Sequence, residues 1–410
     1  MPGFELRPRT ERGEAVVAAA ESLVDALAAR AGDADAANEV DRHNFDQLTR
    51  AGIASAFVPE ELGGMGLDSL HDWVVTIATL ARGDASTAIA INMHLGISRG
   101  LVLAHREAAA RGSEAADALA IPLRRLVSGE MVICATATEP GTNNLHPLTE
   151  AVRDGDGWRI DGRKIFVTLS PIATHLAMNL RVRADDGDQL ATVMLPMDTP
   201  GLIPGEDWDA LGMRSSGSQS VRFEGARVGE QDVRAIGPWG EWSVAMLQNR
   251  TVTNLPLVGA FLGIAEAAHD LAISHLAGST RVGRPAVDAS GVQHMVAEMT
   301  LELARCRAIL DAAAVELDAY FERHGQTGAA IEEAHRLMAD YQAAKWTVNR
   351  GAIDVVSKAM DLLGGGGYTN AHPLARLYRD VRAGPFMQPF SPTELREYVG
   401  QVALGQYPER

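Results

Sequence analysis

Two stretches of the sequence hold the residue types from which a catalytic site would be argued. The segment GPFMQPF, residues 384–390, follows Arg379 and Asp380 and contains no side chain that titrates near neutral pH. Its Gln388 carries an amide, which does not take a proton from a substrate. The segment therefore supplies no acid–base group of its own, and its apolar residues suit a dry, apolar pocket. His94, in the apolar stretch STAIAINMHLG, has the ordinary pKa of a general base, although a lone histidine in an apolar helix is also a common core residue.

Other groups of polar residues lack the spacing of a metal or nucleotide site. His146, in GTNNLH, and His372 are better read as loop residues, so we expect no metal. The turn RVGRP, residues 281–285, is basic enough for a phosphate but carries no further signal. No Gly-x-Gly-x-x-Gly follows a predicted strand, which argues against a Rossmann dinucleotide site.

Composition excludes several classes of partner. The formal net charge is −16, so no basic surplus is available to neutralise nucleic-acid phosphates or an anionic membrane surface. The two cysteines, Cys134 and Cys306, stand far apart in apolar surroundings, which favours a reducing compartment. The N-terminus MPGFELRPRTERGE lacks the apolar core of a secretory signal. No stretch approaches the roughly 20 continuous apolar residues of a membrane helix, and we expect a cytoplasmic protein.

Three segments that differ in composition and apolar pattern must position these residues. Residues 1–130 and 239–410 show the apolar period of helices, as in GVQHMVAEMTLELARCRAIL. Residues 131–238 instead contain short β-branched strands such as WRIDGRKIFVTL, separated by turns such as DGDG and DTPG. The sequence thus predicts a mainly α protein with a central β-domain, divided into domains at 1–130, 131–238 and 239–410.

Several stretches resemble, in the same order, motifs of the acyl-CoA dehydrogenase superfamily of FAD enzymes. They are FVPEELGGMGLD (57–68), STAIAINMHLG (86–96), ATEPG (137–141), IDGRKIFVT (160–168), LGMRSSGSQSVRFEGARV (211–228) and LLGGGGYTNAHPLARLYRDVR (362–382). Each is weak alone, and their common order makes the resemblance specific. It implies an N-terminal helical domain, a middle β-barrel-like domain and a C-terminal four-helix bundle, with FAD between the last two.

The resemblance also implies which residues contact the flavin ring. Thr138 stands where the superfamily's threonine hydrogen-bonds the isoalloxazine. Phe166 matches the aromatic residue that stacks on one flavin face. Thr168 would reach flavin N5, the atom that accepts hydride in this superfamily.

The resemblance implies a second set of residues, which would contact the diphosphate or adenosine end of the cofactor. Gly364, Gly365 and Gly367 would let the backbone approach the FAD of a neighbouring subunit. Arg281 would replace a displaced arginine that meets the same FAD's diphosphate. The resemblance accordingly implies a homodimer or homotetramer.

The sequence departs from the superfamily at the catalytic base. Dehydrogenases of this superfamily remove the substrate's α-proton with a glutamate eight residues beyond the aspartate of Arg-Asp, and that position here is Gln388. An alternative position near the start of the first C-terminal helix holds Thr253, followed by Asn254 where arginine is usual. Both positions therefore lack a carboxylate.

Three functions remain open. The first is α,β-dehydrogenation of an acyl thioester such as an acyl-CoA, with His94 or Glu394 as a relocated base and an electron-transfer flavoprotein as acceptor. The second is oxygenation of an aromatic or amine substrate by reduced flavin, supplied by a flavin reductase and needing no strong base. The third is a flavin-binding scaffold without catalysis, which the retained Thr138, Phe166 and Thr168 disfavour.

Overall fold

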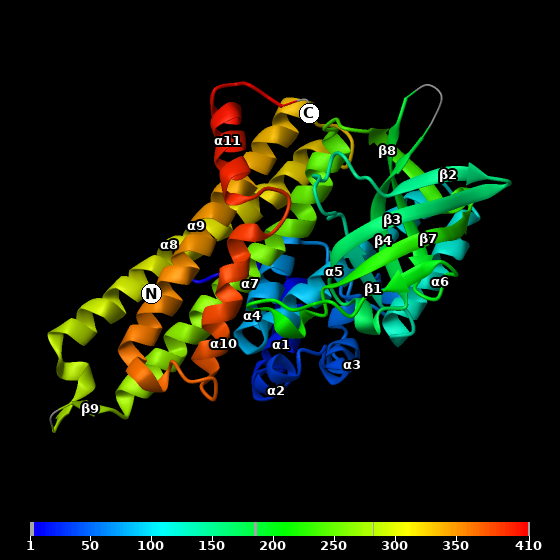
Figure 1. Ribbon diagram of the computed structural model, residues 1–410. Helices are drawn as coiled ribbons and strands as arrows, with labels where there is room; N and C mark the ends of the chain where they lie inside the picture. Colours follow the sequence, from blue (N-terminus) through cyan, green and yellow to red (C-terminus); the bar gives the residue numbers. More distant parts are fainter. Residues whose placement is uncertain (1–3, 184–186, 282, 409–410) are drawn as a thin grey trace.

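The computed structural model describes residues 4–183, 187–281 and 283–408, with helices at both ends of the chain and a β-domain between them (Figure 1). This confirms the predicted fold class. The helices of the first part are α1 (Glu11–Glu21), α2 (Val24–Ala37), α3 (Arg42–Arg50), α4 (Leu70–Gly83), α5 (Ala85–Ala110) and α6 (Ala115–Ser128).

Helices α4 and α5 begin at side-chain caps that the sequence supplies. The Ser69 hydroxyl accepts a hydrogen bond from the backbone N–H of Asp72 at 3.1 Å, and the Asp84 carboxylate accepts from the N–H groups of Ser86 and Thr87. Such caps satisfy N–H groups that the first helical turn leaves without partners. Both helices therefore start at defined residues, and the cap at Asp84 determines which α5 residues face the core.

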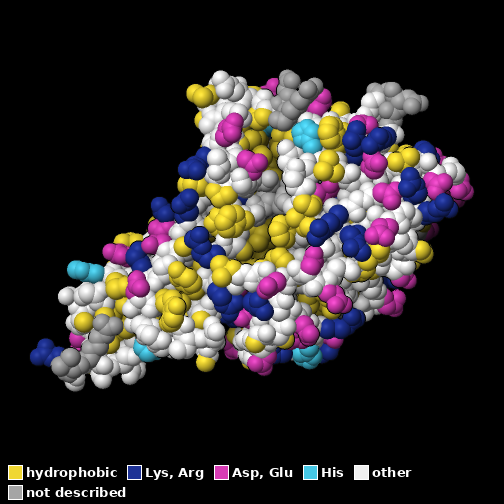
Figure 2. Space-filling model, in the orientation of Figure 1, with side chains coloured by type: hydrophobic (Ala, Val, Ile, Leu, Met, Phe, Trp, Pro, Cys, Tyr) yellow, Lys and Arg dark blue, Asp and Glu magenta, His cyan; other side chains and the backbone are white. Residues whose placement is uncertain are grey.

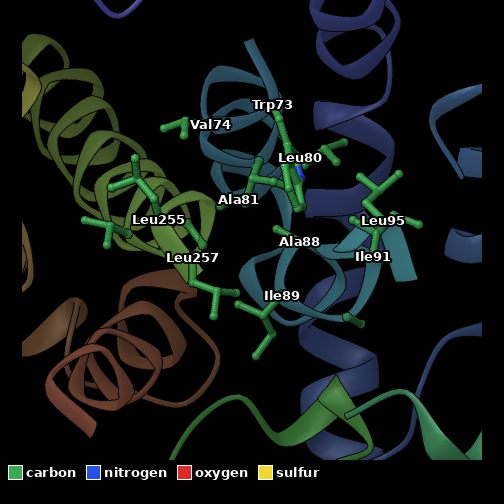
Figure 3. Close-up of a cluster of buried hydrophobic side chains, with 14 of the residues drawn as sticks. Trp73, Val74, Leu80, Ala81, Ala88, Ile89, Ile91, Leu95, Leu255 and Leu257 are labelled. Atoms are coloured by element: carbon green, nitrogen blue, oxygen red, sulfur yellow. The ribbon is translucent and has the colours of Figure 1, made fainter. Parts of the chain in front are cut away.

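The core of the molecule lies where α4, α5 and α7 (Val244–Ala277) meet. Side chains from all three helices point toward one another there, among them those of Trp73 and Leu95 (Figure 3). Two glycines let α7 approach α4 closely. A Cβ atom at Gly259 would lie 2.8 Å from the carbonyl oxygen of Val74, and one at Gly263 would lie 2.2 Å from that of Ala78. This contact joins the N-terminal helices to the C-terminal bundle.

The β-domain is an eight-stranded sheet in the order β6-β7-β3-β2-β4-β5-β8, with β1 paired in parallel to β4. Strands β3 and β7 are antiparallel, and their register shifts between Lys164 and Val167. The strands are β1 (Ile133–Thr136), β2 (Glu150–Asp154), β3 (Gly157–Val167), β4 (His175–Val182), β5 (Gln189–Pro196), β6 (Leu202–Pro204), β7 (Gln219–Gly229) and β8 (Val233–Pro238).

The C-terminal part consists of three long helices and two short ones that pack on them (Figure 1). The two short helices are α10 (Pro373–Asp380) and α11 (Pro392–Ala403), and the segment between them begins with the 3-10 helix η9 (Val381–Phe386) and continues through Gln388. The elements of this part are α7, the hairpin β9 (Thr280–Arg281) and β10 (Arg284–Pro285), α8 (Ser290–His324), α9 (Ile331–Leu363), η8 (Gly364–Gly366), α10 (Pro373–Asp380), η9 (Val381–Phe386) and α11 (Pro392–Ala403).

Two helices match membrane spans by length and composition alone. They are α5 and α7, whose most apolar windows have mean hydropathies of 1.3 and 1.4. Half of the α5 window and 61% of the α7 window are buried inside the protein. Both helices contribute to the core described above, which is the ordinary reason for an apolar helix in a globular fold.

Candidate active site

The side chain of Gln388 bridges the C-terminal part and the β-domain. Its Nε2 donates a hydrogen bond to the hydroxyl of Thr138, and its Oε1 accepts one from Nδ2 of Asn144. Thr138 and Asn144 both lie in the loop that follows β1. The structure thus brings together two residues that the sequence predicted for one site, Thr138 and Gln388. Because the Thr138 oxygen accepts from the amide, its own hydrogen remains free to donate to a ligand.

Helix α9 holds the backbone of this bridge in place. The hydroxyl of Tyr341 donates to the carbonyl oxygen of Gln388 at 2.5 Å. The ammonium group of Lys345 donates to the carbonyl oxygens of Met387 and Phe390, the latter at 2.6 Å. Burial lowers the pKa of Lys345 to about 7, because the charged form loses its hydration. Sequence reasoning missed both residues, since Tyr341 and Lys345 lie in a helix that reads as core.

A buried ion pair fixes the loop on the other side of the bridge. Lys164 of β3 lies 2.5 Å from the Glu139 carboxylate, and both side chains are almost completely buried. Glu139 also accepts hydrogen bonds from the backbone N–H groups of Leu148 and Thr149. Burial lowers the pKa of Lys164 to about 8, although Glu139 acts in the opposite direction. Both residues lie in motifs that the sequence analysis identified, Glu139 in ATEPG and Lys164 in IDGRKIFVT, but their ion pair was not predicted.

Phe166 is turned outward by the irregularity in β3. Its backbone φ is 55°, a conformation that costs a bulky residue roughly 1–2 kcal/mol. The ring is 53% exposed and meets Trp208 edge-on, with the ring centroids 5.9 Å apart. An exposed aromatic face held in a strained conformation fits a planar ligand such as a flavin.

Thr168 lies beside Phe166 but is largely buried. Its hydroxyl shares a hydrogen bond of 2.9 Å with that of Ser218, which in turn lies 2.7 Å from the Ser216 hydroxyl. Its role at flavin N5 stays a prediction.

Figure 2 shows hydrophobic side chains gathered around a hollow between the helices and the β-domain.

His94 does not face an open site. It is fully buried, its Nε2–H donates to the carbonyl oxygen of Ala54 at 2.9 Å, and its Nδ1 accepts from the N–H of Ile133 at 3.1 Å. Burial lowers the pKa of His94 to about 4. Both ring nitrogens are engaged with backbone groups, so we correct the expectation that His94 is a catalytic base. It is a structural residue that joins α5 to β1.

Glu394 is engaged at the start of α11. Its carboxylate accepts a 2.8 Å hydrogen bond from the backbone N–H of Ser391, and the Ser391 hydroxyl accepts from the N–H of Glu394. This is a capping box, which gives the carboxylate a role in the helix start. Glu394 also borders a cavity of about 210 Å³ beside Phe390.

The residues predicted for the diphosphate end lie apart from this bridge. Gly364 and Gly365 belong to η8, and a Cβ atom at either would meet nothing within 4 Å, whereas one at Gly367 would lie 3.0 Å from Cβ of Leu363. Arg281 ends strand β9, at the end of the bundle remote from the β-domain (Figure 1), and its side chain lies outside the described residues. Their contact with a neighbouring subunit's cofactor stays a prediction.

The donor set of the site suits a flavin. Among the described residues, no group of three or more His, Cys, Asp or Glu side chains is arranged to hold a metal ion. The exposed ring of Phe166 and the free hydroxyl hydrogen of Thr138 instead fit a planar, hydrogen-bonding cofactor.

Fold and site together define the class of flavin-dependent oxidoreductases with a helix–sheet–helix arrangement of three domains. Three family models match the chain in this order: acyl-CoA dehydrogenase N-terminal domain over residues 10–111, middle domain over 133–226 and C-terminal domain over 242–388. The chain belongs to the acyl-CoA dehydrogenase superfamily.

Similar proteins within this superfamily include enzymes named for another reaction. The chain is 38% identical over 402 residues to L-evernosamine nitrososynthase of a Micromonospora species, covering 97% of this chain and 92% of that protein. It is 36% identical over 403 residues to the amino sugar nitrososynthase DnmZ of Streptomyces peucetius, covering 97% and 95%. The X-ray structure of KijD3 with FMN and dTDP-3-amino-2,3,6-trideoxy-4-keto-3-methyl-D-glucose superposes with a TM-score of 0.89 at 32% identity, covering 98% and 96%.

Proposed function

We propose that this protein is a reduced-flavin-dependent oxygenase that oxidises the amine of a nucleotide-linked amino sugar. The substrate class is supported by the names of the two nitrososynthases and by the ligand of KijD3. A second substrate consistent with the resemblance, an acyl thioester, serves as the comparison in the test below.

The observation that carries the proposal is the Gln388 bridge. Removal of an α-proton from a thioester requires a carboxylate at the reacting carbon. Gln388 offers an amide whose nitrogen and oxygen are both engaged. Thr253 donates its hydroxyl to the carbonyl oxygen of Asn249, and Asn254 donates to that of Arg250, so neither supplies a base. An amine needs no such base, because its nitrogen lone pair reacts directly with an oxidant.

The proposed reaction balances as two successive oxidations. In the first, the amine nitrogen gains one atom of O₂, reduced flavin supplies two electrons and two protons, and the second oxygen atom leaves as water. In the second, the hydroxylamine nitrogen gains one atom of a second O₂, a second reduced flavin supplies two electrons and two protons, and the other oxygen atom leaves as water. The resulting N,N-dihydroxy group loses one more water, and a nitroso group remains. A flavin reductase is the partner that would supply reduced flavin.

The residues of this chain bind and orient the reactants. Phe166 would stack on the flavin, and Thr138, held by Gln388, would donate its hydroxyl hydrogen to it. Tyr341 and Lys345 keep the bridging segment in place by binding its carbonyl groups. Phe386 is 69% exposed and Met387 and Phe390 are half-buried, so a bound substrate would have to complete the exclusion of water from the reacting atoms.

The cofactor itself is proposed as FMN, which KijD3 holds in its solved structure. FAD, expected from the family resemblance, is the alternative. Titration of flavin-free protein with either compound separates the two, because FMN lacks the adenosine end for which Gly364, Gly365, Gly367 and Arg281 were predicted.

The function is tested by offering both substrate classes to the same flavin-loaded protein. We expect an amino sugar nucleotide to be oxidised at nitrogen in the presence of oxygen, NADH and a flavin reductase. We also expect no bleaching of oxidised flavin when acyl-CoA esters are added without oxygen. Bleaching by an acyl-CoA, with no oxidation of the amine, would show a dehydrogenase instead. No reaction with either class would favour a scaffold.

A further inference from the structure

Arg250, on α7, is a largely buried cation for which the described residues supply no ion-pair partner. Its Nε and Nη2 atoms are completely buried and have no hydrogen-bond partner in the described part of the chain, while the residue as a whole stays partly accessible. Other buried cations differ in this respect. Lys164 binds Glu139, and Arg376 lies 3.4 Å from the Asp380 carboxylate.

A guanidinium in this situation calls for an anion. Burial lowers the pKa of Arg250 only to about 10, so the group keeps its charge near neutral pH. An unpaired buried charge is strongly unfavourable unless an oppositely charged group neutralises it. The planar guanidinium matches the oxygens of a phosphate or carboxylate, which accept two parallel N–H bonds.

Arg250 lies close to the candidate active site. Its charge acts on Lys164, whose partner Glu139 follows Thr138 in the chain. Its carbonyl oxygen accepts from Nδ2 of Asn254, one turn further along α7. The guanidinium therefore lies near Lys164, whose partner Glu139 belongs to the loop that follows β1.

The nearby carboxylate does not neutralise Arg250. Glu139 is already engaged with Lys164 and with the N–H groups of Leu148 and Thr149, through both of its oxygens. With no partner among the described residues, an anion from outside the chain would balance the charge.

We propose that Arg250 binds the diphosphate of the substrate, an inference that rests on the proposed function. Phosphate oxygens come from a sugar nucleotide or from the flavin, and both offer the acceptors that a guanidinium binds. The proposed substrate carries a diphosphate, and the measurements below distinguish it from the flavin phosphate.

The test measures binding of thymidine diphosphate to the FMN-loaded protein by calorimetry. Arg250→Gln should weaken this binding by about 10- to 100-fold, the range of a charge-assisted hydrogen bond. Binding of thymidine, which has no phosphate, should not change between wild type and variant. Arg250→Lys keeps the positive charge but not the two parallel N–H donors of the guanidinium. Its affinity for thymidine diphosphate should therefore lie between those of wild type and Arg250→Gln. Arg227→Gln, at an exposed arginine paired with Asp154, is the matched control and should bind like wild type.

Folding and cofactor binding supply the remaining controls. Because Arg250→Gln removes an unpaired buried charge, its melting temperature without ligand should equal or exceed that of wild type. A weaker affinity for FMN with unchanged thymidine diphosphate binding would assign the anion to the flavin and overturn the proposal. Unchanged binding of both, or no binding of thymidine diphosphate by wild type, would also overturn it. Loss of nucleotide binding in a protein that oxidises no amine would keep the diphosphate site and refute the proposed function alone.

Discussion

Replacing Gln388 by alanine tests the bridge between the C-terminal part and the β-domain. Asn144 is 7% exposed, so loss of its acceptor leaves a buried amide donor unsatisfied, which costs about 1–3 kcal/mol. Loss of the hydrogen bond to Thr138 adds about 1 kcal/mol. We expect Gln388→Ala to lower the free energy of unfolding by about 2–4 kcal/mol in urea titrations.

A companion substitution separates stability from cofactor binding. In Gln388→Glu the carboxylate still accepts from Asn144, but it cannot donate to Thr138. The Thr138 hydroxyl would then donate to the carboxylate, and its hydrogen would no longer be free for the flavin. Gln388→Glu should therefore stay near wild-type stability while its affinity for FMN, measured by flavin fluorescence, falls about tenfold.

A double-mutant cycle decides whether this reasoning holds. Gln388→Ala and Thr138→Val, measured singly and together, should show a coupling free energy of about 0.5–1.5 kcal/mol. A coupling near zero, together with a Gln388→Ala variant as stable as wild type, would refute the bridge as an energetic link.

Three further predictions concern the surroundings of the bridge. Glu139→Gln should lower the free energy of unfolding by about 3–5 kcal/mol, because the buried Lys164 would lose its charged partner; a change below about 1 kcal/mol would contradict the role of this pair. The lowered pKa of Lys345, about 7 in the folded protein, means that the unfolded chain binds more protons between about pH 7 and pH 10.5; stability should rise with pH across that window, and urea titrations of Lys345→Met should show a smaller rise, to which Lys164, with its pKa lowered to about 8, still contributes. Phe166→Ala should change stability by less than about 0.5 kcal/mol, because the ring is exposed, yet weaken FMN binding about tenfold; an unchanged FMN affinity would remove Phe166 from the flavin site.

The order of helices and strands could be predicted from the sequence because it depends on local patterns. Apolar periodicity and turn residues identified the helical parts and the β-domain, and the motifs in chain order identified the superfamily. The absence of a carboxylate at position 388 was equally visible, since it depends only on the identity of one residue.

The contacts of the site could not be predicted, because they join residues far apart in the chain. Gln388 and Thr138 are 250 positions apart, and nothing in either segment indicates that an amide replaces a base by bridging two loops. His94 shows the same limit. Its apolar helix indicated burial, but only the packing of α5 against Ala54 and Ile133 shows that both ring nitrogens are engaged with backbone groups.

The central claim, oxygenation of an amine, is tested most directly with labelled oxygen. The protein would be incubated with FMN, NADH, a flavin reductase and a nucleotide-linked amino sugar under ¹⁸O₂, and the product analysed by mass spectrometry. The account predicts a product that carries one ¹⁸O atom on its nitrogen and is absent without reduced flavin. An unlabelled product, or consumption of reduced flavin with the amine left intact, would contradict it.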